Sequence, residues 1–185
     1  MKPEIIHPEI DPSEQPRNGL DHVIHGLGNI LSLLFIFTVG ISFYEVLMRY
    51  LFDSPTIWVH ETASFIGGCL FVYGGSYAMA TNKHVRVVLI YDIVSDTARR
   101  YLNVFHHILG LVFTSLLIWA SFQMVHDSWL SPLGGWYLET SGSAWNPAFP
   151  ALVKGTIFLT ICLMFAQFFL HLIQEINGLR KHKNV

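Results

Sequence analysis

Three charged residues lie beside long apolar segments of the chain, where a charge is costly unless it is paired. They are Glu45, Arg49 and Glu61. Glu45 and Arg49 are one helical turn apart and can form an ion pair on one helix face. Glu61 follows Pro55, after which a second helix can begin, and we expect it to reach the same arginine. Two hypotheses stay open: a structural clasp between two helices, or a polar contact with a partner subunit or a coupling ion.

Four of the ten histidines suggest a second kind of chemistry, the binding of haem. These are His25, His106, His107 and His171, all close to the ends of apolar segments. Paired histidines on facing helices hold haem in membrane bundles, so a haem-binding membrane anchor subunit of a redox complex is the alternative function. Polar side chains near helix ends need no ligand to explain them, and we therefore expect no cofactor.

No other motif in the sequence points to catalysis. Cysteine and histidine do not occur at the spacing of a metal site, no glycine-rich phosphate loop follows a strand, and no nucleophile motif is present. The two cysteines, Cys69 and Cys162, lie in the middle of apolar segments, where packing is the expected role. We therefore predict neither an enzyme nor a nucleic-acid-binding protein.

The charged residues are distributed unevenly along the chain. They make up 13% of its 185 residues, about half the share of a soluble domain. Four segments, 22–44, 62–82, 101–126 and 155–174, contain no Asp, Glu, Lys or Arg. A helix needs about 20 apolar residues to cross a bilayer core, and each segment has that length. The sequence therefore predicts an all-α integral membrane protein with a four-helix membrane domain at 22–178.

The transmembrane helices are expected at about 23–52, 56–81, 103–126 and 151–178. Residues 85–100 carry an apolar stripe opposite a charged one at helical spacing, and they are too charged to span a membrane. This pattern predicts an amphipathic interfacial arm helix between the second and third transmembrane helices. The arm either braces a partner or fixes the depth of the protein in the membrane, or it only connects its two neighbours.

The basic residues predict the orientation, because Lys and Arg are concentrated in cytoplasmic connections. Nine lie in the two tails and the middle connection: Lys2, Arg17, Lys83, Arg86, Arg99, Arg100, Arg180, Lys181 and Lys183. The first and third connections hold only Arg49 and Lys154. Both termini are therefore expected in the cytoplasm. We expect a disordered tail at 1–21, with Asp21 capping the first helix, and a basic tail at 179–185.

Two further features suggest contacts with other helices or proteins. Small residues on one face of the second helix allow another helix to approach closely; they are Ala63, Gly67, Gly74 and Ala78. The connection at 127–150 is rich in aromatic residues and proline, and we expect it to fold back on the outer membrane surface or against another protein. Its possible outer contacts are Trp129, Trp136, Trp145 and, in the helix that follows, Lys154.

Several of these residues occur in an order that resembles a known family. The first helix ends in a run from Glu45 to Phe52, followed by Pro55, Trp58 and Glu61. The later parts of the pattern are Asn82-Lys83-His84-Val85, Asp92, Trp145, Pro147, the run from Pro150 to Lys154, and Gln167. Over about 20–174, the chain looks like the small membrane subunit (DctQ type) of tripartite ATP-independent periplasmic (TRAP) transporters.

The resemblance implies a scaffold role in a transporter of the bacterial inner membrane. In this family, the small subunit supports a large membrane subunit with solute and sodium sites, and a periplasmic binding protein delivers the solute. Transport uses an ion gradient, usually of sodium, and the solutes are mostly small carboxylated molecules. The expected partners are therefore the large subunit, the binding protein and the lipid bilayer. The expected structural clasp or subunit interface consists of Glu45, Arg49, Tyr50, Trp58 and Glu61.

Overall fold

The computed structural model describes residues 16–81 and 95–183, and within these ranges the chain is mostly helical. Its helices are α1 (Gly19–Tyr50), α2 (Val59–Ala80), α4 (Asp96–Trp129) and α5 (Phe149–Lys183). All four are long and apolar enough to cross a membrane. The described residues form no strand and hold one isolated bridge, between Leu130 and Trp136. The predicted all-α membrane fold with four spanning helices is therefore confirmed.

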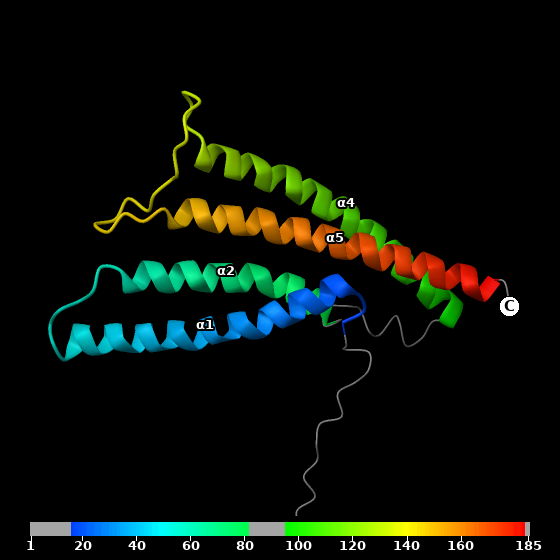
Figure 1. The fold of residues 1–185 in the computed structure, drawn as a ribbon, viewed down its shortest axis with the longest axis horizontal. Coiled ribbons are helices and arrows are strands. Elements are labelled where there is room, and N and C mark those ends of the chain that lie inside the picture. Colours follow the sequence, from blue (N-terminus) through cyan, green and yellow to red (C-terminus); the bar gives the residue numbers. More distant parts are fainter. Residues whose placement is uncertain (1–15, 82–94, 184–185) are drawn as a thin grey trace, which may run out of the picture.

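The four helices form a single row in the order α1, α2, α5, α4 (Figure 1). α2 contacts α1 and α5, and α5 also contacts α4. Figure 1 shows the helices converging beside the start of α1, beyond which α4 and α5 extend further; we call this side of the row the terminal end. They spread apart at the opposite end, the loop end, where 51–58 joins α1 to α2 and 130–148 joins α4 to α5. A row of this kind has two broad faces.

Most of the apolar surface of the helices faces outward. In the most apolar 18-residue stretch of each helix, 11% of the residues are buried in α1 and α4, and 22% are buried in α2 and α5. The share is lower for α1 and α4 because these helices lie at the two ends of the row. So large an apolar surface has to be covered by lipid or by another membrane protein.

Gly28 and Gly110 are two of the glycines that allow neighbouring helices to come close together. A Cβ atom at Gly28 of α1 would lie 2.3 Å from the ring of Tyr77 in α2, and one at Gly110 of α4 would lie 2.3 Å from the ring of Phe168 in α5. Phe168 is 4% exposed, so its ring has little room to move. The lack of a side chain at these two positions therefore sets how closely the helices pack.

α1 begins earlier than predicted, and a different residue caps it. The side chain of Asn18, whose backbone is extended, accepts a hydrogen bond of 2.9 Å from the backbone N–H of Asp21. The prediction that Asp21 caps the helix is wrong, because Asp21 lies inside the first turn and is fully buried. Residues 19–21 are helical, so the predicted disordered tail at 1–21 does not reach its expected end; its first part, 1–15, lies outside the described residues.

α4 also begins earlier than the predicted third helix. Ser95 caps it by accepting a hydrogen bond from the backbone N–H of Ala98 at 3.5 Å. Residues 96–100, predicted as the end of the interfacial helix, are instead the first turns of α4. A continuous helix pairs its own backbone groups across the membrane boundary, which favours this arrangement. The rest of the predicted interfacial helix, 85–94, lies outside the described residues and stays a prediction.

The other helix ends differ from the prediction by a few residues. α1 ends at Tyr50, before the expected 52, and α2 starts at Val59, after the expected 56. α5 continues to Lys183, so residues 179–183 of the predicted basic tail are helical.

Candidate functional site

At the loop end, Glu45 connects α1 to the segment that leads into α2. The Arg49 guanidinium donates to Glu45 Oε1 through Nη2 at 2.7 Å and through Nε at 3.2 Å. Thr56 donates to the other oxygen, Oε2, from its backbone N–H at 3.0 Å and from its hydroxyl. Glu45 is 5% exposed, whereas the Arg49 side chain is 44% exposed. The Glu45 carboxylate therefore links the segment after α1 to the last turns of that helix.

Glu61 takes no part in this ion pair, and the expectation that it reaches Arg49 is wrong. The groove around the pair is lined on the α2 side by Val59, His60 and Ala63. Successive helix residues are about 100° apart, so Glu61 points away from the face that Val59 and Ala63 share. It points instead toward the seam between α2 and α5.

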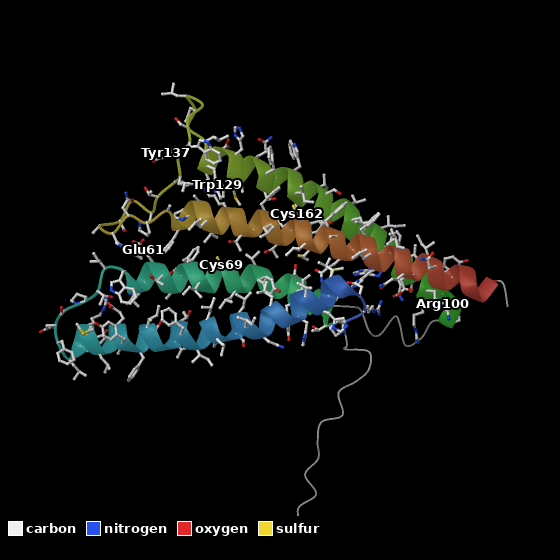
Figure 2. The ribbon with its side chains drawn as sticks, in the orientation of Figure 1. Glu61, Cys69, Arg100, Trp129, Tyr137 and Cys162 are labelled. Atoms are coloured by element: carbon white, nitrogen blue, oxygen red, sulfur yellow. The ribbon has the colours of Figure 1, made fainter. Side chains whose placement is uncertain are left out.

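Glu61 lines a cleft of about 450 Å³ at this seam. The cleft is also lined by Ser64, Phe65, Met124, Ser141, Phe149, Pro150, Val153, Lys154 and Ile157. The rings of Phe65 and Phe149 stack across the seam, with centroids 4.4 Å apart. Glu61 Oε2 is buried, and among the described residues it has no hydrogen-bond partner. Figure 2 places Glu61 at the start of α2, beside the connection that leads into α5.

Lys154 of the same cleft is paired with an acid from the loop. Its Nζ donates to Glu139 Oε2, which also accepts a hydrogen bond from the Ser128 hydroxyl. The backbone N–H of Glu139 donates to the carbonyl of Ser128 at 2.9 Å. The hydrogen bonds from Lys154 and Ser128 hold the pKa of Glu139 below its ordinary value. This set joins the end of α4, the loop and the start of α5.

Two of the residues predicted as outer contacts therefore have partners within the chain. Lys154 is one of them, and Trp129 is the other: its indole Nε1 donates to the carbonyl of Ala151 at 2.8 Å. The other two tryptophans remain more accessible, with Trp136 83% and Trp145 41% exposed. Whether these residues contact another protein stays a prediction.

The two glycines of the small-residue face predicted on α2 make no close contact with another described helix. A Cβ atom at Gly67 or Gly74 would meet nothing within 4 Å. The residues that contact α5 lie one and two positions after Gly74: a Cβ at Gly75 would lie 3.6 Å from the sulfur of Met164, and Ser76 is fully buried. Ala63 lines the groove at Arg49, and Ala78 is half-buried. A face of Ala63, Gly67, Gly74 and Ala78 for another protein stays a prediction.

Tyr50 and Trp58 lie at the loop end without entering the ion pair. Tyr50 is 78% exposed and lines the groove that also holds Glu45 and Arg49. Trp58 is 36% exposed, and its ring lies 6.5 Å from that of Tyr44. An aromatic side chain of this kind suits the membrane–water boundary.

A second polar cluster, at the terminal end, was missed by the sequence analysis. The carboxylate of Asp21 in α1 is fully buried and accepts a hydrogen bond from Gln167 Nε2 at 3.0 Å. His171 Nε2 lies 2.7 Å from the other Asp21 oxygen, and Gln167 Nε2 also donates to the carbonyl of Ser76 at 3.1 Å. One network thus joins α1, α2 and α5. Gln167 Oε1 has no partner among the described residues, but a neutral oxygen costs less to bury than a charged one.

A signal for this cluster was present in the sequence. Gln167 and His171 are four residues apart and therefore share one face of an apolar helix. Two polar side chains on such a face require a partner. Asp21 is 146 residues from Gln167 and 150 from His171, so nothing local identified it as that partner.

The four histidines of the haem hypothesis do not form one site. His106, His107 and His171 are neighbours, with ring centroids 5.6 Å apart for both His106–His107 and His107–His171. His25 stacks on Tyr77 instead, at 5.5 Å, and His171 Nε2 is held by Asp21. Within 16–81 and 95–183, no group of three or more His, Cys, Asp or Glu residues could hold a metal ion.

Comparison with known proteins connects this geometry to a family. The family described as "Tripartite ATP-independent periplasmic transporters, DctQ component" matches residues 38–180. The chain is also 32% identical over 99 residues to the sialic acid TRAP transporter permease protein SiaT of Haemophilus influenzae (strain 86-028NP). That alignment covers 51% of this chain and 15% of the relative, so the chain corresponds to a small part of that longer protein. Neither match supports the haem-anchor alternative.

Proposed function

Because the chain belongs to the DctQ component family and is a small, multi-pass inner-membrane subunit of a bacterial TRAP transporter, we propose that it acts as the scaffold of that transporter. In this role it supports the large membrane subunit, which takes up a small organic, usually carboxylated, solute. A periplasmic binding protein delivers the solute, and a sodium gradient drives uptake. The family is one of transporter components and not of enzymes, and the scaffold itself carries out no chemical step.

The one-layer arrangement of the helices is the observation that carries this proposal. Transporters place solute and ion sites at interrupted helices inside a bundle, whereas α1, α2, α4 and α5 are each continuous and stand in one row. A row with two broad apolar faces is suited to extend the surface of a larger membrane protein. It provides a stationary platform rather than a path for the solute.

The proposed orientation follows from the basic residues. The terminal end, with Arg17 and the C-terminal end of α5, then faces the cytoplasm, and the loop end faces the periplasm. Exposed Trp136 and Trp145 lie on the side from which the binding protein approaches. Fusion of a reporter to each terminus tests this orientation: reporters that are active only in the cytoplasm should be active at both ends.

Purification and transport measurements together test the scaffold role. We expect the tagged chain, expressed with the large subunit, to purify with it in detergent. We also expect proteoliposomes to take up solute only when the large subunit, this chain and the binding protein are all present. Recovery of the tagged chain alone, or full uptake without it, would overturn the proposal.

A further inference from the structure

An unpaired carboxylate oxygen lies in the cleft at the loop end. Oε2 of Glu61 is buried and accepts no hydrogen bond from any described residue. Every other acid described near this end has a partner or is exposed: Glu45 is held by Arg49 and Thr56, Glu139 by Lys154, and Asp53 and Asp127 face solvent. Glu61 is therefore the acid whose partner the described chain does not provide.

The described walls of the cleft donate no hydrogen bond to Glu61 Oε2. They are largely apolar and come from α2, α4 and α5, with Phe65, Met124 and Phe149 among them. Lys154 is the basic residue of the lining, and Glu139 already neutralises it. The net charge of the cleft is therefore negative, and its source is Glu61.

A long basic side chain complements these features. A carboxylate at membrane depth favours a cation as its partner. Arg and Lys can lay their hydrocarbon stems along apolar walls while the charged head reaches an acid, and the stacked rings of Phe65 and Phe149 offer a second attraction for a cation. The volume of about 450 Å³ lies within the usual range for a binding pocket.

We propose that this cleft is a docking site for one Lys or Arg side chain of the large membrane subunit, with Glu61 as its anion. The inference rests on the proposed function, since it assigns the occupant to the partner of that complex. It places one contact of the large subunit at the α2–α5 seam, in the middle of the row. The Glu45–Arg49 pair, which is complete within the chain, has no corresponding role.

Complex formation by the Glu61→Gln variant tests the docking site. The large subunit, co-expressed with the tagged chain and purified in detergent, should be recovered with wild type but roughly 10-fold less well with Glu61→Gln, because a desolvated pair loses one charge. Asp53→Asn is the matched control: it removes an exposed acid at the same end, and Asn accepts the positive φ of 50° at this position. This control should bind like wild type.

Separate measurements distinguish the possible outcomes. The isolated Glu61→Gln chain should unfold at the wild-type temperature or above it, so a loss of complex reports on docking and not on folding. Glu61→Lys should weaken the complex further, and one Lys→Glu or Arg→Glu change in the large subunit should restore it, identifying the partner residue.

Three results would overturn the docking site. Wild-type recovery of the complex with Glu61→Gln would remove the docking site and leave the scaffold role intact. Failure of the wild-type chain to bind the large subunit would overturn both. Native mass spectrometry adds a third: a phospholipid that is lost in Glu61→Gln while the complex persists would assign the cleft to lipid.

Discussion

The acidic side chains at the two ends of the helix row differ in the number and origin of their partners. At the terminal end, buried Asp21 is bonded to Gln167 and His171, and Gln167 continues the network to Ser76. These bonds tie three helices together. At the loop end, Glu45 is bonded only within α1 and the segment that follows it, and Glu139 joins α4 to α5 through Ser128 and Lys154. Glu61 Oε2 has no partner among the described residues.

The chain itself provides the hydrogen-bond partners of Asp21, whereas the described residues provide none for Glu61 Oε2. A buried carboxylate is stable when hydrogen bonds and a nearby basic group compensate for the lost water. Asp21 meets this condition with groups of its own chain, so the terminal end ties three of the four helices together. At the loop end the helices spread apart (Figure 1), and the cleft that Glu61 lines lies there.

Removal of Asp21 should have the largest effect on the isolated chain. Asp21→Ala leaves His171 Nε2 without its acceptor and Gln167 Nε2 with only the carbonyl of Ser76, and the loss of one member of such a set costs about 3–5 kcal/mol. Asp21→Asn, which keeps one carbonyl oxygen, should cost less. Thermal unfolding of the purified chain in detergent measures both. If Asp21→Ala unfolds at the wild-type temperature, the terminal end does not hold the row.

A side chain at Gly110 should have the next largest effect. Gly110→Leu places new atoms against the buried ring of Phe168, and such overpacking costs about 1–3 kcal/mol. Gly67→Leu is the matched control, because nothing lies within 4 Å of its Cβ position; it should leave the unfolding temperature of the isolated chain unchanged or raised. Equal losses for both variants would contradict the assignment of Gly110 as the close contact.

Loss of Arg49 should have a smaller effect. The Arg49 side chain is 44% exposed, and Glu45 keeps its hydrogen bonds from Thr56 when the arginine is removed. We therefore expect Arg49→Ala to cost about 1 kcal/mol or less. The same unfolding measurement at low and high salt checks this, since a screened ion pair should matter less in salt. A loss of several kcal/mol would mean that the pair is desolvated.

The pH dependence contributed by Glu139 should be the smallest effect. Its pKa is lowered in the folded chain from an ordinary value of 4.5. The stability it contributes is therefore complete above about pH 4.5 and is lost as the pH falls through the lower folded value. Glu139→Gln should reduce the loss of stability between pH 4.5 and the lower folded pKa, and it should leave the stability at neutral pH nearly unchanged. If the variant loses as much stability at acid pH as wild type, the pH dependence belongs to other groups.

The fold was more predictable than the contacts, and particular residues show why. The length and apolar composition of each of the four segments predict a spanning helix, because both are local properties of the sequence. The cap at Asn18 was missed because Asp21, three residues later, is an equally good capping residue by type. Gly67 and Gly74 were assigned to packing by their spacing, yet Gly28 and Gly110 make the close contacts.

The site residues were identified correctly only where both partners are close in sequence. Glu45 and Arg49 are four residues apart, and the structure pairs them as the spacing predicts. Glu61 was assigned to the wrong neighbour, because spacing along the chain does not reveal which face of α2 turns toward α1. His25 was grouped with three other histidines because all four lie close to the ends of apolar segments, although it stacks on Tyr77.

The sequence alone determined the number of spanning helices, the family and the pairing of Glu45 with Arg49. These depend on composition and on contacts within a helical turn or two. Only the tertiary structure decided the order α1, α2, α5, α4, the burial of Asp21 against α5, and the direction of Glu61 into the cleft. The physical reason is that each of these depends on how helices far apart in sequence rotate and pack against one another. Lipid-facing helices that are apolar all round do not encode that rotation in a local pattern.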